Sequence, residues 1–194
     1  RILKGELNLH LASQLLSSFF LGKDVELHSN VIGILPGGGS RPFLIRERVP
    51  TTYFVTLQNV AEGVPFRHDV ARGTPLPPNS LDQLRAMRDA GVEIGAHTRT
   101  HPVLAEIQDS ERLYDEVVES GRELEILCGQ RVRYFACPYG MRRHIHPDLF
   151  PLARGAGYEA VVSAYGGYNF LGNDDFHLQR IHGAPVMVEL QNWV

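Results

Sequence analysis

The sequence has little cysteine, no long apolar run and no marked excess of either charge. Its 194 residues include two cysteines, Cys128 and Cys137, too few for a disulfide framework or a cysteine-rich zinc site. No apolar run approaches the roughly 18 residues that a membrane-spanning helix needs, so we expect no membrane span. The formal net charge of −3 provides no attraction to the phosphate backbone of nucleic acid, which we exclude as a partner.

Internal repeats and blocks of like charge are also missing, and 43% of the residues are hydrophobic. This composition fits one globular domain with a real core. The chain begins at Arg1 without a methionine, so we interpret it as a fragment or a processed product. No feature of the sequence assigns a compartment.

Strand and helix signals alternate along the chain from residue 51 onward. Apolar, β-branched runs predict strands, and capping residues followed by helically spaced apolar positions predict helices. The expected strands are 51–57, 92–97, 133–137, 159–165 and 176–182, and the expected helices are 81–91, 111–129, 146–157 and 186–194. This alternation predicts an α/β fold with a parallel sheet, either a barrel or a doubly wound sheet.

Histidine is frequent, with nine residues, and one pair is placed for chemistry. His97 and His101, in the stretch EIGAHTRTHPVL, are four residues apart at the end of an expected strand. Imidazoles at this spacing can reach one metal ion at about 2.0–2.1 Å each, although such pairs also occur on solvated helix faces. Active sites of parallel α/β folds lie at this end of the strands, which favours a metal site.

Three stretches together resemble the polysaccharide deacetylase family, also called the NodB-homology domain or carbohydrate esterase family four. EIGAHTRTHPVL resembles the family's His-Ser/Thr-x-x-His motif, VPTTYFV resembles its second strand, and VRYFACPYG resembles its Phe-x-x-Pro-Tyr-Gly loop. The resemblance implies a distorted (β/α) barrel of about seven parallel strands. Residues 46–194 would form the catalytic domain, and residues 1–45 a poorly matching N-terminal portion of the barrel.

The resemblance also implies an activity and the residues that carry it. Family members use a divalent metal ion, often zinc, whose bound water attacks an acetyl group of an acetylated polysaccharide or oligosaccharide. The metal ligands would be His97 and His101, with Thr98 and Arg180 supporting the site. The backbone N–H of Tyr139 would form the oxyanion hole, and His182 would be the general acid. The remaining substrate-binding positions would be Pro138, Gly140 and Tyr165.

The family's first motif, Thr-Phe-Asp-Asp-Gly, has no clear counterpart here. By position Asp24 falls on the catalytic base, Val25 on the third metal ligand and Glu26 on the glycine. On a strand Asp24 and Glu26 would point to the same face, so together they could restore the base and the ligand, with the two roles unassigned. The alternatives are a catalytically impaired carbohydrate-binding domain and a hydrolase of other linear or cyclic amides on the same barrel. Members of the family are often extracytoplasmic or associated with the cell envelope.

Overall fold

A computed structural model describes residues 52–165, 169 and 174–180 of the chain. The poorly matching segment expected over residues 1–45 and the closing helix expected over residues 186–194 lie outside these ranges. None of the helices within the described ranges has the length and apolar character needed to cross a membrane.

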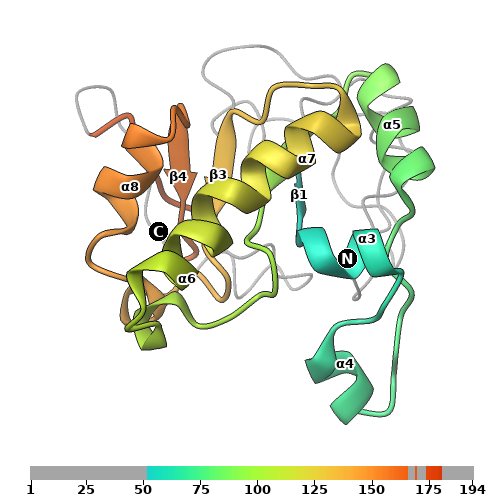
Figure 1. The fold of residues 1–194 in the computed structure, drawn as a ribbon, viewed down its shortest axis with the longest axis horizontal. Helices are drawn as coiled ribbons and strands as arrows, with labels where there is room; N and C mark the ends of the chain where they lie inside the picture. Colours follow the sequence, from blue (N-terminus) through green and yellow to red (C-terminus); the bar gives the residue numbers. More distant parts are fainter. Residues whose placement is uncertain (1–51, 166–168, 170–173, 181–194) are drawn as a thin grey trace, which may run out of the picture.

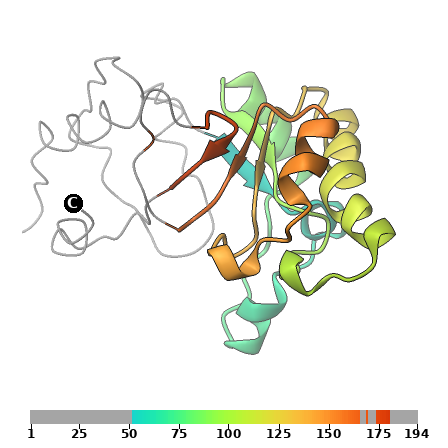
Figure 2. The same cartoon turned by 90° about the vertical axis from the view of Figure 1, so that its left-hand side faces the viewer.

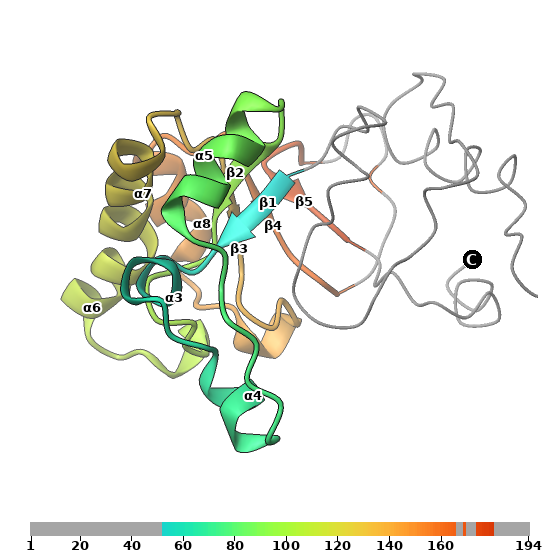
Figure 3. The same ribbon diagram turned by 90° about the vertical axis from the view of Figure 1, so that its right-hand side faces the viewer.

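Five parallel strands form one sheet in which the spatial order equals the order in the sequence, β1-β2-β3-β4-β5. The register aligns Val55 with Ala96 and carries on through Phe135, Val161 and His177. The strands are β1 (Thr52–Val55), β2 (Glu93–Ala96), β3 (Tyr134–Ala136), β4 (Ala160–Val162) and β5 (His177–Leu178). Sequential parallel strands joined by right-handed connections place their helices on one face of the sheet, and Figures 2 and 3 show helices on one face.

Six α-helices and a π-helical turn connect the strands within the described ranges (Figure 1). The π-helical turn, Asp115–Glu119, lies between two of these helices and continues their axis. The helices are α3 (Leu57–Glu62), α4 (Arg67–Ala71), α5 (Leu81–Asp89), α6 (Ser110–Tyr114), α7 (Ser120–Cys128) and α8 (Leu149–Gly155). Short 3-10 turns cover Leu104–Glu106 and Arg142–His144.

The core lies between the sheet and the helices that cover it. Helices α5 and α7 pack against β2, and α8 packs against β4. Leu84 of α5 and Leu124 of α7 are fully buried, as are Ile94 of β2 and Phe135 of β3. Full burial of a leucine or phenylalanine side chain contributes about 1.5–3 kcal/mol. The apolar positions that predicted the helices are therefore the ones that hold them on the sheet.

Several local predictions differ from the structure, and the strand expected over 159–165 covers only Ala160–Val162. The strand expected over residues 51–57 ends at Val55, because helix α3 begins at Leu57. Neither α3 nor α4 was predicted, since both are short and neither has a side-chain cap. The long helix expected over 111–129 is present, but the π-helical turn divides it.

The α/β fold with a parallel sheet is confirmed, and the described residues contain five strands of the expected barrel of about seven. The sequential strand order is that of a barrel wall. In the described residues the five strands form a row whose ends, β1 and β5, do not pair with each other, so closure of the barrel is not shown.

Candidate functional site

Polar side chains gather where the five strands end. Because all strands are parallel and in register, their carboxyl ends meet at one edge of the sheet. Thr56 follows β1 and His97 follows β2. The residues that follow β3, β4 and β5 include Pro138, Ser163 and Arg180 respectively. The structure thus brings together the strand ends that the sequence marked.

His97 is fixed from both neighbouring strands. Its N–H donates to the Val55 carbonyl at 2.9 Å, and its ring Nδ1 lies 2.7 Å from the Ala136 carbonyl oxygen. A carbonyl can only accept, so Nδ1 carries the hydrogen and Nε2 keeps a free lone pair. Burial lowers the pKa of His97 to about 3, and the neighbouring charges of His101 and Arg180 act in the same direction. His97 is therefore neutral near pH 7.

His101 stands at the other end of a strained segment, residues 97–101, which we call the histidine segment. Thr98 and His101 have φ angles of 66° and 60°, a left-handed conformation that is uncommon outside glycine and most unusual for the β-branched Thr98. The buried Thr98 hydroxyl accepts a hydrogen bond from the His101 N–H at 3.0 Å and donates to the His97 carbonyl. Burial lowers the pKa of His101 to about 4, with nearby His68 adding to the effect.

The spacing of the two imidazoles fits a shared metal ion. Their ring centroids are 4.9 Å apart with an interplanar angle of 72°. Two imidazoles bonded to one ion at about 2.0–2.1 Å and a near-tetrahedral angle have centroids about 5 Å apart. Neutral imidazole nitrogens suit zinc and similar divalent ions. The part of the chain that the structure describes has no group of three His, Cys, Asp or Glu side chains able to hold a metal.

The loop after β3 places the Tyr139 side chain against His101. Tyr139 has a φ of 59° and is about half exposed at 49%, and its ring centroid lies 4.9 Å from that of His101. The Gly140 N–H donates to the Pro138 carbonyl at 2.6 Å, and the Gly140 carbonyl accepts from the Ala164 N–H at 2.9 Å. None of the described residues accepts a hydrogen bond from the Tyr139 N–H. Among these residues, that donor is available to a ligand.

Arg180 and Tyr165 lie at the ends of β5 and β4. The Arg180 guanidinium donates from Nε to the Ser163 carbonyl at 3.1 Å, and its central carbon lies 5.8 Å from the centre of the Phe54 ring. Desolvation of the guanidinium lowers the pKa of Arg180. Tyr165 is half-buried against the His177 ring, with 5.4 Å between centroids. Its ring therefore has a protein partner on one side.

Asp24 and His182 lie outside the described residues, so their placement stays a prediction. Cys137 directly precedes the Pro138 loop, but its thiol is buried and burial raises its pKa to about 12. A thiol that is protonated near pH 7 is a poor nucleophile, which agrees with a structural role.

Sequence reasoning missed two features around His101. Phe66 and His68, at the start of α4, have ring centroids 5.3 and 5.8 Å from that of His101. Glu116 of the π-helical turn contacts the histidine segment from the opposite direction. The signal for Glu116 was available, because it lies three residues after Leu113, where the helix buries its apolar stripe.

Solved structures of deacetylases share this fold. The deacetylase PplD of Streptococcus pyogenes, solved in complex with acetate, superposes with a TM-score of 0.62 at 22% identity, covering 79% of this chain and 62% of that one. IcaB of Ammonifex degensii gives a TM-score of 0.60 at 21% identity, covering 78% and 64%. At these identities the likeness concerns the fold alone.

Sequence comparison adds a relative and a family. The chain is 30% identical over 119 residues to a chitooligosaccharide deacetylase of Bradyrhizobium sp. (strain ANU 289), a match that covers 61% of this chain and 45% of the relative. The chain thus spans less than half of that relative and less than two thirds of the two structures. A sequence model described as polysaccharide deacetylase matches residues 41–161, more than half of the chain. This chain belongs to the polysaccharide deacetylase family.

Proposed function

We propose that this chain is a metal-dependent deacetylase that removes acetyl groups from N- or O-acetylated oligosaccharides or polysaccharides. The observation that carries the proposal is the pair of neutral imidazoles, His97 and His101, 4.9 Å apart at the carboxyl edge of the sheet. Membership of the family and the relative that is a chitooligosaccharide deacetylase support the substrate class.

The two histidines would hold the ion, with zinc the expected metal. A bound divalent ion supplies a polarised acetyl carbonyl and a water of lowered pKa. The Ala136 carbonyl keeps the His97 tautomer that presents Nε2, and such carbonyl partners orient metal-binding imidazoles in general. His97 would therefore present Nε2 to the ion.

The Tyr139 N–H would stabilise negative charge that develops on the acetyl oxygen. This N–H has no acceptor among the described residues. The Tyr139 ring packs against the ring of His101. Removing one such donor typically costs about 3 kcal/mol of transition-state stabilisation. Tyr139 and Tyr165 would flank the sugar. Pro138 and Gly140 would shape the turn that carries Tyr139.

Bound metal and released acetate, measured together, test the proposal. We expect the wild-type chain to bind zinc and to release acetate from N-acetylated chitooligosaccharide, and the His97→Ala/His101→Ala variant to do neither. His146→Ala is the matched control, because His146 contacts Asp148 on another loop. Equal metal content in wild type and the double variant would refute the proposal.

One observation favours a second candidate, a carbohydrate-binding domain with impaired catalysis. The described residues contain no group of three side chains able to hold a metal, whereas catalytic zinc sites usually have three protein ligands. Calorimetric titration with the same oligosaccharide separates the two functions. Saccharide binding without acetate release, at saturating zinc, would support the binding domain.

A further inference from the structure

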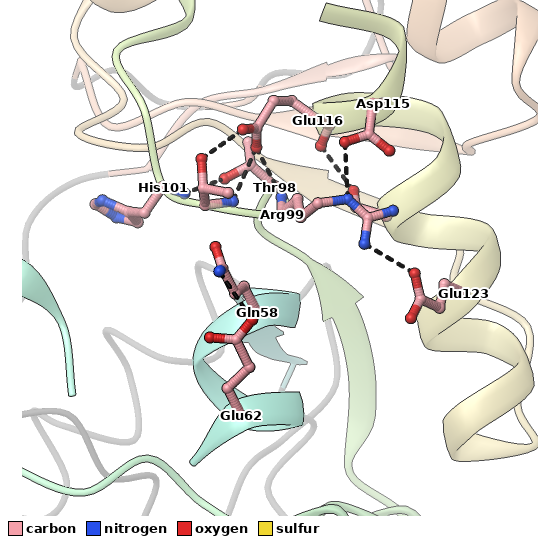
Figure 4. Close-up of polar contacts among 10 residues, drawn as sticks. Gln58, Glu62, Thr98, Arg99, His101, Asp115, Glu116 and Glu123 are labelled. Atoms are coloured by element: carbon pink, nitrogen blue, oxygen red, sulfur yellow. Dashed lines mark hydrogen bonds and ion pairs between the residues drawn. The ribbon is translucent and has the colours of Figure 1, made fainter. Parts of the chain in front are cut away.

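Glu116 is the one charged residue among those fully buried in the described part of the chain, with 2% of its surface exposed. Figure 4 shows its carboxylate directed at the backbone of the histidine segment. Oε2 accepts from the N–H groups of Arg99 and Thr100, both at 2.9 Å, and Oε1 accepts from the Thr100 hydroxyl. A carboxylate is costly to bury unless it is well hydrogen-bonded, and these three donors satisfy that need.

The donors to Glu116 lie between the two histidines. The histidine segment contains two residues with positive φ, and strained backbone of this kind persists only where its surroundings hold it. From the side of α3, Leu57 and Gln58 donate their N–H groups to the carbonyls of Thr98 and Arg99 at 3.1 and 2.9 Å. Glu116 holds the N–H groups of the segment from the opposite side. Hydrogen bonds therefore hold both carbonyl groups and N–H groups of the histidine segment.

The π-helical turn presents Glu116, and other side chains support this turn. The Ser120 hydroxyl donates to the Glu116 carbonyl, and the Tyr158 hydroxyl donates to the Val117 carbonyl, both at 2.7 Å. A Cβ on Gly121 would lie 1.9 Å from the Tyr158 hydroxyl, so glycine is needed for that bond. Single π-helical turns occur often at functional sites.

Arg99 adds a weaker connection to the same helix. Its guanidinium bonds Asp115 and Glu123, each at 2.8 Å, as Figure 4 shows. Both carboxylates are nearly half exposed, and exposed ion pairs contribute little. The Arg99 guanidinium therefore pairs with Asp115 and Glu123, and the buried Glu116 carboxylate bonds the two backbone N–H groups and the Thr100 hydroxyl.

We propose that Glu116 is a positioning residue that holds the histidine segment so that His97 and His101 face one metal ion. This inference rests on the proposed function, because the ion is part of it. Glu116 does not touch the ion or the substrate. It acts through Arg99 and Thr100.

The test measures zinc affinity of the full chain by competition with a chromophoric chelator, alongside amide hydrogen exchange in the metal-free protein. Glu116→Ala should weaken zinc binding about 10- to 100-fold, the usual effect of losing a group that supports a metal ligand. The amides of Arg99 and Thr100 should exchange faster. Glu116→Gln should weaken binding less, because its amide oxygen still accepts from both N–H groups.

Glu116→Asp separates placement from charge and serves where the alanine variant fails to fold. It keeps the carboxylate but withdraws it by one methylene, so zinc affinity should fall although the charge is unchanged. Glu119 lies on the same π-helical turn and pairs with Arg122. The Glu119→Gln variant should bind zinc as wild type does. Ser80→Ala, which destabilises the distant helix α5, should also leave zinc affinity unchanged.

The outcomes distinguish this inference from the proposed function. If the double histidine variant binds zinc as tightly as wild type, the metal site itself is refuted and the inference falls with it. If binding depends on the histidines but Glu116→Asp and Glu116→Ala match wild type, Glu116 positions nothing and only the inference is overturned.

Discussion

The two histidines of the candidate site are kept neutral by their surroundings, and this should appear in the pH dependence of stability. The folded-state pKa values are about 3 for His97 and about 4 for His101, against 6.5 for an unperturbed histidine. Between about pH 4 and 6.5 the unfolded chain therefore binds protons that the folded chain does not. The stability associated with neutral imidazoles is fully present above pH 6.5 and is lost as the pH falls toward 4.

Urea unfolding of the metal-free chain between pH 4.5 and 7 measures this effect, and His97→Gln/His101→Gln is the comparison. The slope of unfolding free energy against pH should be smaller in the variant by about 1.4 kcal/mol per pH unit for each histidine that stays neutral. Carboxylates contribute equally to both proteins. Identical slopes would mean that both imidazoles titrate normally in the folded chain.

Gly140 offers a second test at the scale of one residue. Its φ is 63°, and a Cβ there would lie 2.5 Å from the Ala164 Cβ and 2.6 Å from the Ala164 nitrogen. Gly63 has a similar φ of 68° but nothing within 4 Å of the added Cβ, so Gly63→Ala isolates the cost of the backbone conformation. That cost is roughly 1–2 kcal/mol.

Gly140→Ala should lose stability by the same amount plus about 1–3 kcal/mol for overpacking, and acetate release should fall at least tenfold. Tyr139→Phe should remain close to wild type, because the proposed donor is the backbone N–H and not the phenol. The measurements are urea unfolding and acetate release at saturating zinc. A larger loss for Tyr139→Phe than for Gly140→Ala would identify the phenol as the working group.

At the scale of elements, a capping box begins α5, one of the helices that the sequence predicted. The Ser80 hydroxyl accepts from the Gln83 N–H at 3.2 Å, and the Gln83 side chain accepts from the Ser80 N–H at 2.8 Å. Ser80→Ala should lower the free energy of unfolding by about 1 kcal/mol and leave zinc affinity intact. Urea unfolding checks the first expectation and chelator competition the second. Unchanged stability would show that α5 needs no cap.

The elements that carry periodic or capping signals were predictable, and those that lack them were not. Ser80 and Gly129 mark helix ends through side-chain chemistry and left-handed backbone. Helix α3 follows a strongly β-prone run and has no capping bond, so local propensity favoured a continued strand. Its formation depends on bonds from Leu57 and Gln58 to the histidine segment, which are contacts distant in sequence.

The same distinction separates the residues of the candidate site that could be predicted from those that could not. His97, His101 and the Pro138–Gly140 loop could be found because their residue types and strand-end positions are local features. Glu116 and Ser120 stood at buried positions of an apolar helical stripe, but their partners were not visible in the sequence. A polar residue in such a stripe indicates a buried hydrogen-bond network without naming its other members.

At the scale of the whole molecule, the described residues contain no group of three side chains able to hold a metal, while catalytic zinc sites usually have three protein ligands. The family's first motif would provide the third ligand and the base, and Asp24 and Glu26 are the acids close to its expected position. Residues two apart on a strand share a face, so these two carboxylates can act together. Their roles stay a prediction, as does that of His182.

The deciding comparison is acetate release and zinc affinity for wild type, Asp24→Asn and Glu26→Gln. If Glu26 is the ligand, Glu26→Gln should weaken zinc binding, because a neutral amide is a poorer ligand than a carboxylate. Asp24→Asn should then leave zinc affinity close to wild type and abolish turnover at saturating zinc, since it removes the base. If Asp24→Asn weakened zinc binding and Glu26→Gln abolished turnover at saturating zinc, Asp24 would be the ligand and Glu26 the base. Turnover that survives both substitutions would show that neither carboxylate acts and that the third ligand comes from another segment. An absence of turnover in all three proteins, with saccharide binding retained, would favour the impaired binding domain.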